Sequence, residues 1–128
     1  MTENDIAKEV VDCAIEVHRE MGPGLLESVY EACLCIELRE RGLKVERQVI
    51  VPVTYKGQKL ELGFRADIIV ESKFLVELKA TSELTDVHLA QTLNYLKLLN
   101  FNLGLLLNFN VALLKHGIRR VINSKKDY

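Results

Sequence analysis

The chain has 128 residues, the size of one domain, and is long enough to bury about two-thirds of its unfolded surface. Its formal net charge of −1 excludes the global basic field that marks a high-affinity, non-specific nucleic-acid binder, but leaves room for a local basic patch. No run approaches the roughly 18 apolar residues of a membrane span, and Met1 is followed by four polar residues, so we expect a cytoplasmic single domain over residues 1–128, with no signal peptide and no membrane contact.

Two helices are predicted in the first third of the chain. An apolar stripe with helical spacing runs through residues 4–21, with Asn4 or Asp5 as the expected N-cap, and Gly22-Pro23-Gly24 ends it. A second helix is predicted from about residue 26 to residue 41.

The three cysteines lie within these helical patterns. Cys33 and Cys35 are two residues apart, so they point in different directions on a helix. We expect Cys13, Cys33 and Cys35 to be small core residues of a reducing compartment, not a disulfide or a zinc site.

The middle of the chain predicts a sheet. Residues 45–55 alternate as one strand, in which Pro52 indicates an edge position or an irregularity. Lys56-Gly57 predicts a tight turn into the next strand. Two central strands follow over residues 64–71 and 74–80, with apolar residues on both faces, as in strands inside a sheet.

Three charged residues interrupt this apolar pair of strands. If the turn holds residues 72–74, then Asp67, Glu77 and Lys79 point the same way, with the two carboxylates as diagonal neighbours about 7–8 Å apart. A hard divalent ion such as Mg²⁺ or Mn²⁺ accepts such oxygen ligands and keeps positions for water and a phosphate. A buried Asp–Lys or Glu–Lys pair that only holds the sheet together is the alternative, and geometry alone leaves both open.

A helix and a buried strand are predicted in the last third. The helix begins at a cap on Thr85 or Asp86 and runs to about Asn100, and the apolar run of residues 103–109 follows as a strand. Because a helical crossover leads into it, this strand is expected to be parallel to the strand before the helix. Residues 112–122 could add an edge strand.

The three histidines fit no metal-ligand spacing. His18 and His116 are expected at the surface. His88 lies one turn before Gln91 and is either a surface residue or a phosphate contact.

The order of these elements resembles the restriction-endonuclease-like fold of the PD-(D/E)xK nuclease superfamily, whose signature is an acid on the second core strand and (D/E)-x-K on the third. Asp67 and Glu77-Leu78-Lys79 match it, although Ala66 stands where the superfamily usually has proline. Gly24 to Tyr30 matches the pattern that names the GxxExxY family of this superfamily, and Arg65-Ala66-Asp67 looks like its strand-two motif. Gln91 to Tyr95 looks like the Q-x-x-x-Y helix motif of recombination exonucleases. The implied fold is α/β, a mixed central sheet of about four to five strands flanked by helices in the order α-α-β-β-β-α-β, with a further edge strand as an option.

The resemblance also implies a site and a reaction. Asp67, Glu77 and the backbone carbonyl of Leu78 would hold the metal, Mg²⁺ or Mn²⁺. Glu27 would complete the acidic cluster directly or through a metal-bound water, although a carboxylate in a first turn also simply stabilises the positive end of a helix. The implied substrate contacts are Gln91, Tyr95, Tyr30, Arg65 and His88. The implied reaction is hydrolysis of a nucleic-acid phosphodiester by a metal-activated water, with DNA favoured over RNA.

Lys79 is flanked by carboxylates, which favour its ammonium form. We therefore expect it to orient the water and stabilise the transition state, not to abstract a proton. Two other functions stay open: a catalytically silent nucleic-acid-binding module, whose expected mark would be a missing Asp67, Glu77 or Lys79, and a protein-interaction subunit, whose mark would be an exposed apolar patch. A homodimer is compatible with the sequence but is not indicated by it.

Overall fold

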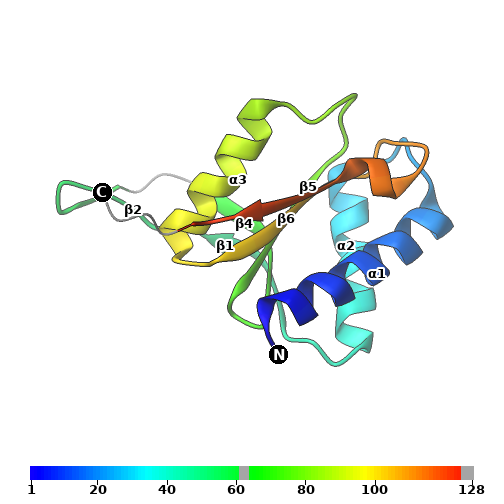
Figure 1. Cartoon of the computed structure of the whole chain (residues 1–128), viewed down its shortest axis with the longest axis horizontal. Helices are drawn as coiled ribbons and strands as arrows, with labels where there is room; N and C mark the ends of the chain where they lie inside the picture. The colour runs from blue at the N-terminus through cyan, green and yellow to red at the C-terminus, as the bar shows by residue number, and fades with distance from the viewer. Residues whose placement is uncertain (61–63, 125–128) are drawn as a thin grey trace.

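A five-stranded mixed sheet forms the centre of the protein, with two helices over one face and one helix over the other (Figure 1). The computed structural model describes residues 1–60 and 64–124. Its elements in chain order are α1 (Glu3–Met21), α2 (Glu27–Glu40), β1 (Val45–Ile50), β2 (Val53–Tyr55), β3 (Gln58–Leu60), β4 (Arg65–Val70), β5 (Phe74–Lys79), α3 (Asp86–Leu99), β6 (Leu103–Asn108), the 3-10 helix η1 (Leu114–Gly117) and β7 (Ile118–Ile122). The sheet order is β1-β4-β5-β6-β7, and β2 pairs with β3 in a separate sheet. The predicted fold class is confirmed.

The sheet separates two apolar cores. Ile68 and Val76 belong to the core under α1 and α2, whereas their neighbours Ile69 and Leu75 belong to the core under α3. Successive residues of a strand therefore enter opposite cores, which explains the continuous apolar runs of the central strands. Among the described residues, no helix combines the length and the apolar character needed to cross a bilayer.

The first helix begins at a different cap from the predicted one. Thr2 is the N-cap: its hydroxyl accepts the Asp5 N–H at 3.1 Å, and the Asp5 carboxylate accepts the Thr2 N–H at 3.0 Å. This reciprocal capping box needs an acid three residues after the cap, so Asp5 serves as its second partner and not as the cap itself. The prediction of Asn4 or Asp5 as N-cap was wrong.

The strand predicted over residues 45–55 is two strands. It breaks at Val51 and Pro52, because proline has no N–H for the sheet and the chain turns away to form the β2–β3 hairpin. The predicted turn at Lys56-Gly57 is confirmed, with φ of 48° and 78° at its two residues, as a two-residue hairpin requires. The hairpin projects from the body of the molecule (Figure 1).

The register of β4 and β5 also differs from the prediction. The loop holds Glu71, Ser72 and Lys73, so that Val70 pairs with Phe74. Glu71 and Ser72 take left-handed φ values of 53° and 58°. Phe74 is completely buried, so the strand keeps it in the core and the polar residues take the turn. If this register is extended by one pair beyond Ile68 and Val76, Asp67 lies opposite Glu77, whereas the prediction placed it opposite Lys79.

The second half of the sheet follows the prediction. β6 is parallel to β5, with Leu78 paired to Leu107 and Lys79 to Asn108, and β7 is an antiparallel edge strand. His116 is exposed, as expected. The prediction of a surface position was wrong for His18, which is buried because α1 presses it against the segment after β6, where its Nε2 lies 2.8 Å from the carbonyl oxygen of Val111.

The cysteines take the predicted core positions. Cys13 and Cys35 are buried, Cys33 is half-buried, and all three are free thiols.

Candidate active site

Asp67 and Glu77 meet where β4 and β5 stop pairing. The regular pairing runs as far as Ile68 and Val76. One residue further, side chains take over the hydrogen bonds: the Asp67 N–H donates to Glu77 Oε1 at 3.1 Å, and the Leu78 N–H donates to Asp67 Oδ2 at 2.9 Å. Each carboxyl group is therefore held by the backbone of the opposite strand, and the two acids are brought together at the end of the ladder.

Glu77 is the more deeply buried of the two acids, with 5% of its surface exposed. Burial, followed by the negative charge of Asp67, raises the pKa of Glu77 to about 9; the charge of Lys79 opposes this weakly. Glu77 therefore carries a proton at neutral pH when no cation is bound. A bound cation would favour the ionised form of Glu77, because its positive charge offsets both the burial and the neighbouring Asp67.

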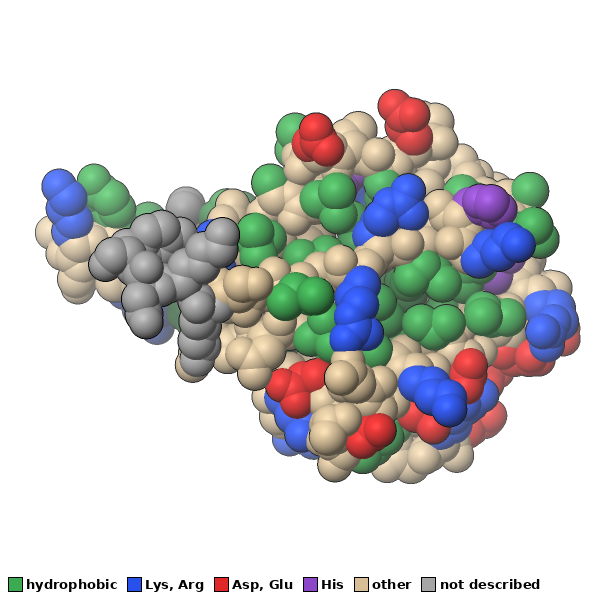
Figure 2. All heavy atoms as spheres, viewed as in Figure 1, with side chains coloured by type: hydrophobic (Ala, Val, Ile, Leu, Met, Phe, Trp, Pro, Cys, Tyr) green, Lys and Arg blue, Asp and Glu red, His purple; other side chains and the backbone are tan. Residues whose placement is uncertain are grey.

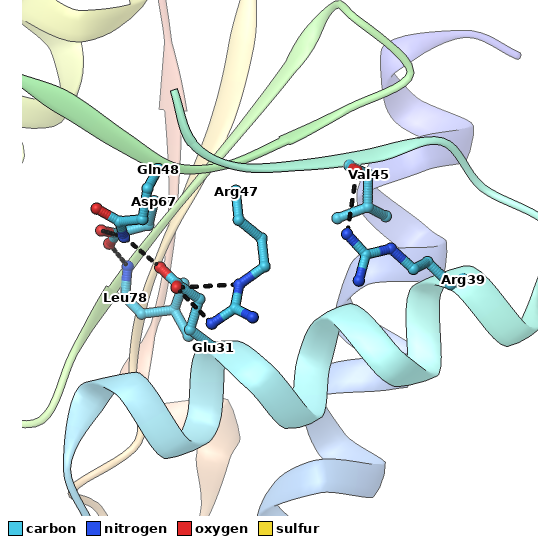
Figure 3. A network of polar contacts seen from close by, with 7 residues as sticks. All are labelled: Glu31, Arg39, Val45, Arg47, Gln48, Asp67 and Leu78. Carbon is cyan, nitrogen blue, oxygen red and sulfur yellow. Dashed lines mark hydrogen bonds and ion pairs between the residues drawn. The ribbon is translucent and has the colours of Figure 1, made fainter. Parts of the chain in front are cut away.

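The second helix contributes Glu31 to this region. Glu31 is buried, and its Oε2 accepts hydrogen bonds from Arg47 Nε at 3.2 Å and Nη2 at 2.9 Å. Figure 3 shows the Glu31 side chain rising from α2 between Arg47 and Gln48. Glu27, which was expected in the cluster, is exposed in the first turn of α2, one helical turn nearer the N-terminus. The structure thus places a second acid of α2, Glu31, in this region, and the role expected of Glu27 stays a prediction.

Gln48 connects the helix acid to the strand acid. Its Nε2 donates to Glu31 Oε1 at 2.7 Å and to Asp67 Oδ1 at 3.3 Å (Figure 3). Gln48 also has a φ of 51°, in the left-handed region that residues other than glycine rarely adopt. Such a conformation costs about 1–3 kcal/mol. Lys56, Glu71 and Ser72 adopt it within turns, whereas Gln48 adopts it inside strand β1. The strain therefore coincides with the side chain that bridges two acids.

The sequence carried a signal for Glu31 but none for Gln48. Glu31 has the spacing of the buried stripe that continues with Leu34, Cys35 and Leu38, and an acid within an apolar stripe indicates a buried charge with partners. Gln48 is one polar residue among several in an alternating strand, and its left-handed φ is visible only in the structure.

The remaining residues of the (D/E)-x-K motif also face this region. Lys79 is half-exposed at the end of β5, and its charge acts on Glu77. The Leu78 N–H points toward Asp67. Because the N–H and C=O of one strand residue point to the same edge, the Leu78 carbonyl points toward β4 as well.

The third helix brings Tyr95 close to the acids. Tyr95 is buried with 7% exposed, and its pKa is raised by burial, then by the charges of Glu77 and Asp67, whereas a hydrogen bond with Gln91 lowers it. Gln91 itself is exposed. The two residues of the Q-x-x-x-Y pattern therefore lie together on the α3 side of the site.

The other expected substrate contacts are placed differently. Tyr30 is completely buried and stacked on Phe109, and its hydroxyl donates to the Gly22 carbonyl at 2.6 Å and accepts the Leu25 N–H at 3.0 Å. These bonds tie the loop between α1 and α2 to the core, so Tyr30 supports the fold and is not open to a substrate.

His88 and Arg65 lie at the periphery. His88 is half-exposed, and its Nδ1 accepts the Thr85 N–H at 3.0 Å, which makes it part of the cap of α3. Arg65 is exposed at the start of β4, two residues before Asp67. Arg65 is thus free to reach a phosphate, whereas one ring nitrogen of His88 is already used.

The donor atoms of this region are of the type that binds a hard cation, although their side chains are not arranged around one. Among the described residues, no three Asp, Glu, His or Cys side chains form a ready-made metal site. The reason is visible in the contacts: Asp67 and Glu77 are turned toward backbone N–H groups, and Gln48 separates Asp67 from Glu31. Oxygen donors from two adjacent carboxyl groups and the Leu78 carbonyl are nevertheless the ligand type that Mg²⁺ and Mn²⁺ prefer.

Comparison with known proteins identifies one family. The sequence model described as the PD-(D/E)XK nuclease superfamily matches residues 4–121. That match spans the elements from α1 to β7, including both strand acids and Lys79. No curated protein and no solved structure matches the chain.

Proposed function

The chain belongs to the PD-(D/E)XK nuclease superfamily, and we propose that it hydrolyses phosphodiester bonds in nucleic acid, with DNA favoured over RNA, in a reaction that requires Mg²⁺ or Mn²⁺. One observation carries the proposal. A buried acid, Glu77, is held against a second acid, Asp67, and its pKa is raised to about 9. The folded protein bears the cost of burying this acid beside another one, and such strongly shifted acids are concentrated at functional sites.

The metal would be held by Asp67, Glu77 and the Leu78 carbonyl, and when bound it would activate a water molecule and neutralise charge on the scissile phosphate. Glu31 takes the place that Glu27 was expected to fill, since it is the helix acid joined to Asp67 through Gln48. Glu27 is left with the ordinary role of an acid in a first turn.

Lys79 supplies a positive charge beside the acids. Its ammonium group orients the attacking water and stabilises the negative charge that develops on the phosphate in the transition state. The alternative function of Lys79, a structural ion pair with Asp67 or Glu77, has no support: in the part of the chain that the structure describes, no ion pair within 4.0 Å joins Lys79 to either acid. A lysine that stays out of such a pair is available to the substrate.

The α3 side of the site receives the substrate. Tyr95 lies near both acids and Gln91 is exposed next to it, so these side chains are placed to contact the phosphate or the water. Arg65 is exposed nearby and contributes a positive charge to the same approach.

Within the superfamily, we assign the chain to the GxxExxY branch on residues 24–30. The contacts give that motif a structural meaning: Tyr30 anchors the loop in which Gly24 adopts a φ of 98°. We also propose that residues 1–128 act as one domain, in the cytoplasm.

A cleavage assay tests the proposal. Single-stranded, duplex and branched DNA, and RNA, are incubated with the protein in Mg²⁺, Mn²⁺ or EDTA. Cleavage should require metal and should fall at least about 100-fold in Asp67→Asn and Lys79→Ala, because each removes one of the groups that stabilise the transition state. Asp12→Asn on the exposed surface of α1 and Lys115→Ala in η1 are matched controls that should cut like the wild type.

The silent-module alternative has its own signature in the same assay. A wild-type protein that binds nucleic acid equally well with and without metal, and that cuts none of the substrates, would be a binding module on this fold. That result would end the proposal of hydrolysis.

A further inference from the structure

A groove opens beside the candidate active site, on the α3 face. Its volume is about 580 Å³, and it lies between α3, the first residue of β2 and the residue before β4. Its lining includes Phe64, Ala90, Gln91, Asn94, Tyr95 and Lys97. This α3 groove adjoins the site at Tyr95 and Gln91, which line it, and the charges of Glu77 and Asp67 act on Tyr95.

The α3 groove presents an aromatic face to solvent. Phe64 is 39% exposed although it packs edge-on against Tyr95, with ring centroids 6.0 Å apart. Val87 and Leu98, 75% and 38% exposed, continue the apolar lining. An apolar groove exposed next to a charged site is typical of a place that binds a ligand with apolar surface of its own.

Polar groups stand at the edges of this apolar surface. The side chains of Gln91 and Asn94 are exposed, and each carries both a hydrogen-bond donor and an acceptor. Lys97 adds a positive charge at one end. An aromatic face, amide groups and a cation together match a nucleobase with its phosphate, since bases stack on aromatic rings and their edges bond to amides.

The neighbouring hairpin has matching charge. Lys56 and Lys59 are exposed on β2–β3, and the Lys56 ammonium lies over the Tyr55 ring, 5.4 Å from its centroid. Figure 2 shows the hairpin standing out from the body, with a Lys or Arg side chain and a hydrophobic side chain at its tip. A chain with a net charge of −1 thus carries exposed cations on the hairpin whose first residue, Val53, lines the groove, and these cations can attract an anionic strand.

We propose that the α3 groove binds an unpaired nucleobase of the strand being cut, so that the protein acts on single-stranded or splayed nucleic acid in preference to continuous duplex. The inference rests on the proposed function, because it assigns a substrate subsite to the same active site. In a duplex the bases are stacked inside the helix, and placing one in the groove would require it to be unpaired first, at a cost that a single strand does not bear.

Binding is measured first, by fluorescence anisotropy in the Asp67→Asn background so that nothing is cut. The probes are a labelled single strand, a duplex of the same length, and a single strand in which the bases are replaced by abasic sites. Phe64→Ala should weaken binding of the single strand about 5- to 150-fold, because losing the stacking of one base on an aromatic ring costs that much. The same variant should change binding of the duplex and of the abasic strand less than about twofold.

Two further variants guard against a folding artefact. Ala90→Leu fills the groove from an exposed position on α3 with a strong helix former, and it should weaken single-strand binding in the same selective way. Ile36→Ala removes an apolar side chain, 56% exposed, from the outer surface of α2, and should leave all three affinities unchanged.

The outcomes separate the two proposals. If Phe64→Ala lowers the affinity for the single strand, the duplex and the abasic strand equally, the base site is wrong. It is also wrong if Phe64→Ala converts a dimer to a monomer while its affinity for the single strand stays unchanged. If the protein with an intact Asp67 cuts nucleic acid with metal and Phe64→Ala changes nothing, the base site fails and the nuclease proposal stands. If that protein cuts nothing but single-strand binding depends on Phe64, the nuclease proposal fails and the base site stands.

Discussion

Replacing Glu77 with glutamine should remove a pH-dependent cost from the metal-free protein. The pKa of Glu77 is 4.5 in its ordinary state and about 9 in the folded chain. Between these values the folded state holds a proton that the unfolded chain has lost, so the free energy of unfolding falls as the pH rises, by about 1.4 kcal/mol per pH unit. The stability that the protonated Glu77 gives the folded state is thus complete below its ordinary pKa of 4.5, and it is lost as the pH rises toward the folded-state pKa of about 9. At pH 7, which is 2.5 units above the ordinary value, the accumulated loss is about 3 kcal/mol.

Urea unfolding in EDTA, from about pH 5.5 to about pH 8.5, measures this loss. Glutamine keeps an Oε1 acceptor for the Asp67 N–H but does not titrate. The wild type should therefore lose stability relative to Glu77→Gln as the pH rises, by about 1.4 kcal/mol per pH unit. Glu83→Gln, at an exposed position, is the control and should show no such slope. A difference that is constant with pH would refute the reasoning, because Glu77 would then ionise normally in the folded state.

The remaining predictions concern metal, the helix acids and the loop anchor. Mg²⁺ should stabilise the wild type more at high pH than at low pH, since binding requires the ionised form of Glu77; thermal unfolding with and without Mg²⁺ checks this, and a pH-independent shift would contradict it. Glu31→Gln should lower kcat/KM for cleavage about 10- to 100-fold, whereas Glu27→Gln should change it less than about threefold; the reverse order would show that the wrong helix acid has been chosen. Tyr30→Phe should cost about 1–2 kcal/mol of stability, because the Gly22 carbonyl and the Leu25 N–H each lose a partner, and calorimetry should show no change if those bonds are unimportant.

The order of the elements could be predicted because periodicity and turn residues carry it. The central strands were predicted correctly because both of their faces are apolar. The parallel direction of β6 followed from the rule that a helical crossover joins parallel strands. The break at Pro52 was visible only as an irregularity, because the sequence does not state whether the chain after a proline rejoins the same sheet.

The site could be predicted in part. Charges in an apolar strand pair are costly, and for that reason the sequence drew attention to Asp67 and Glu77, which the structure brings together. Their register could not be predicted, because it depended on whether the loop took residues 71–73 or residues 72–74. Glu31 was not among the predicted site residues because the motif directs attention to Glu27, and the two differ by one helical turn. Gln48 could not be found, since its role depends on a backbone angle that no residue type encodes.

The location of bound metal decides whether the acid pair is a cation site. A crystal grown with Mn²⁺ would show the ion as an anomalous peak. The peak is expected at ligand distance from carboxylate oxygens of Asp67 and Glu77 and from the Leu78 carbonyl, and absent from Asp67→Asn crystals grown in the same way. A Mn²⁺ peak elsewhere, in a protein that cuts nucleic acid with the acid pair still bonded only to its backbone partners, would contradict this assignment.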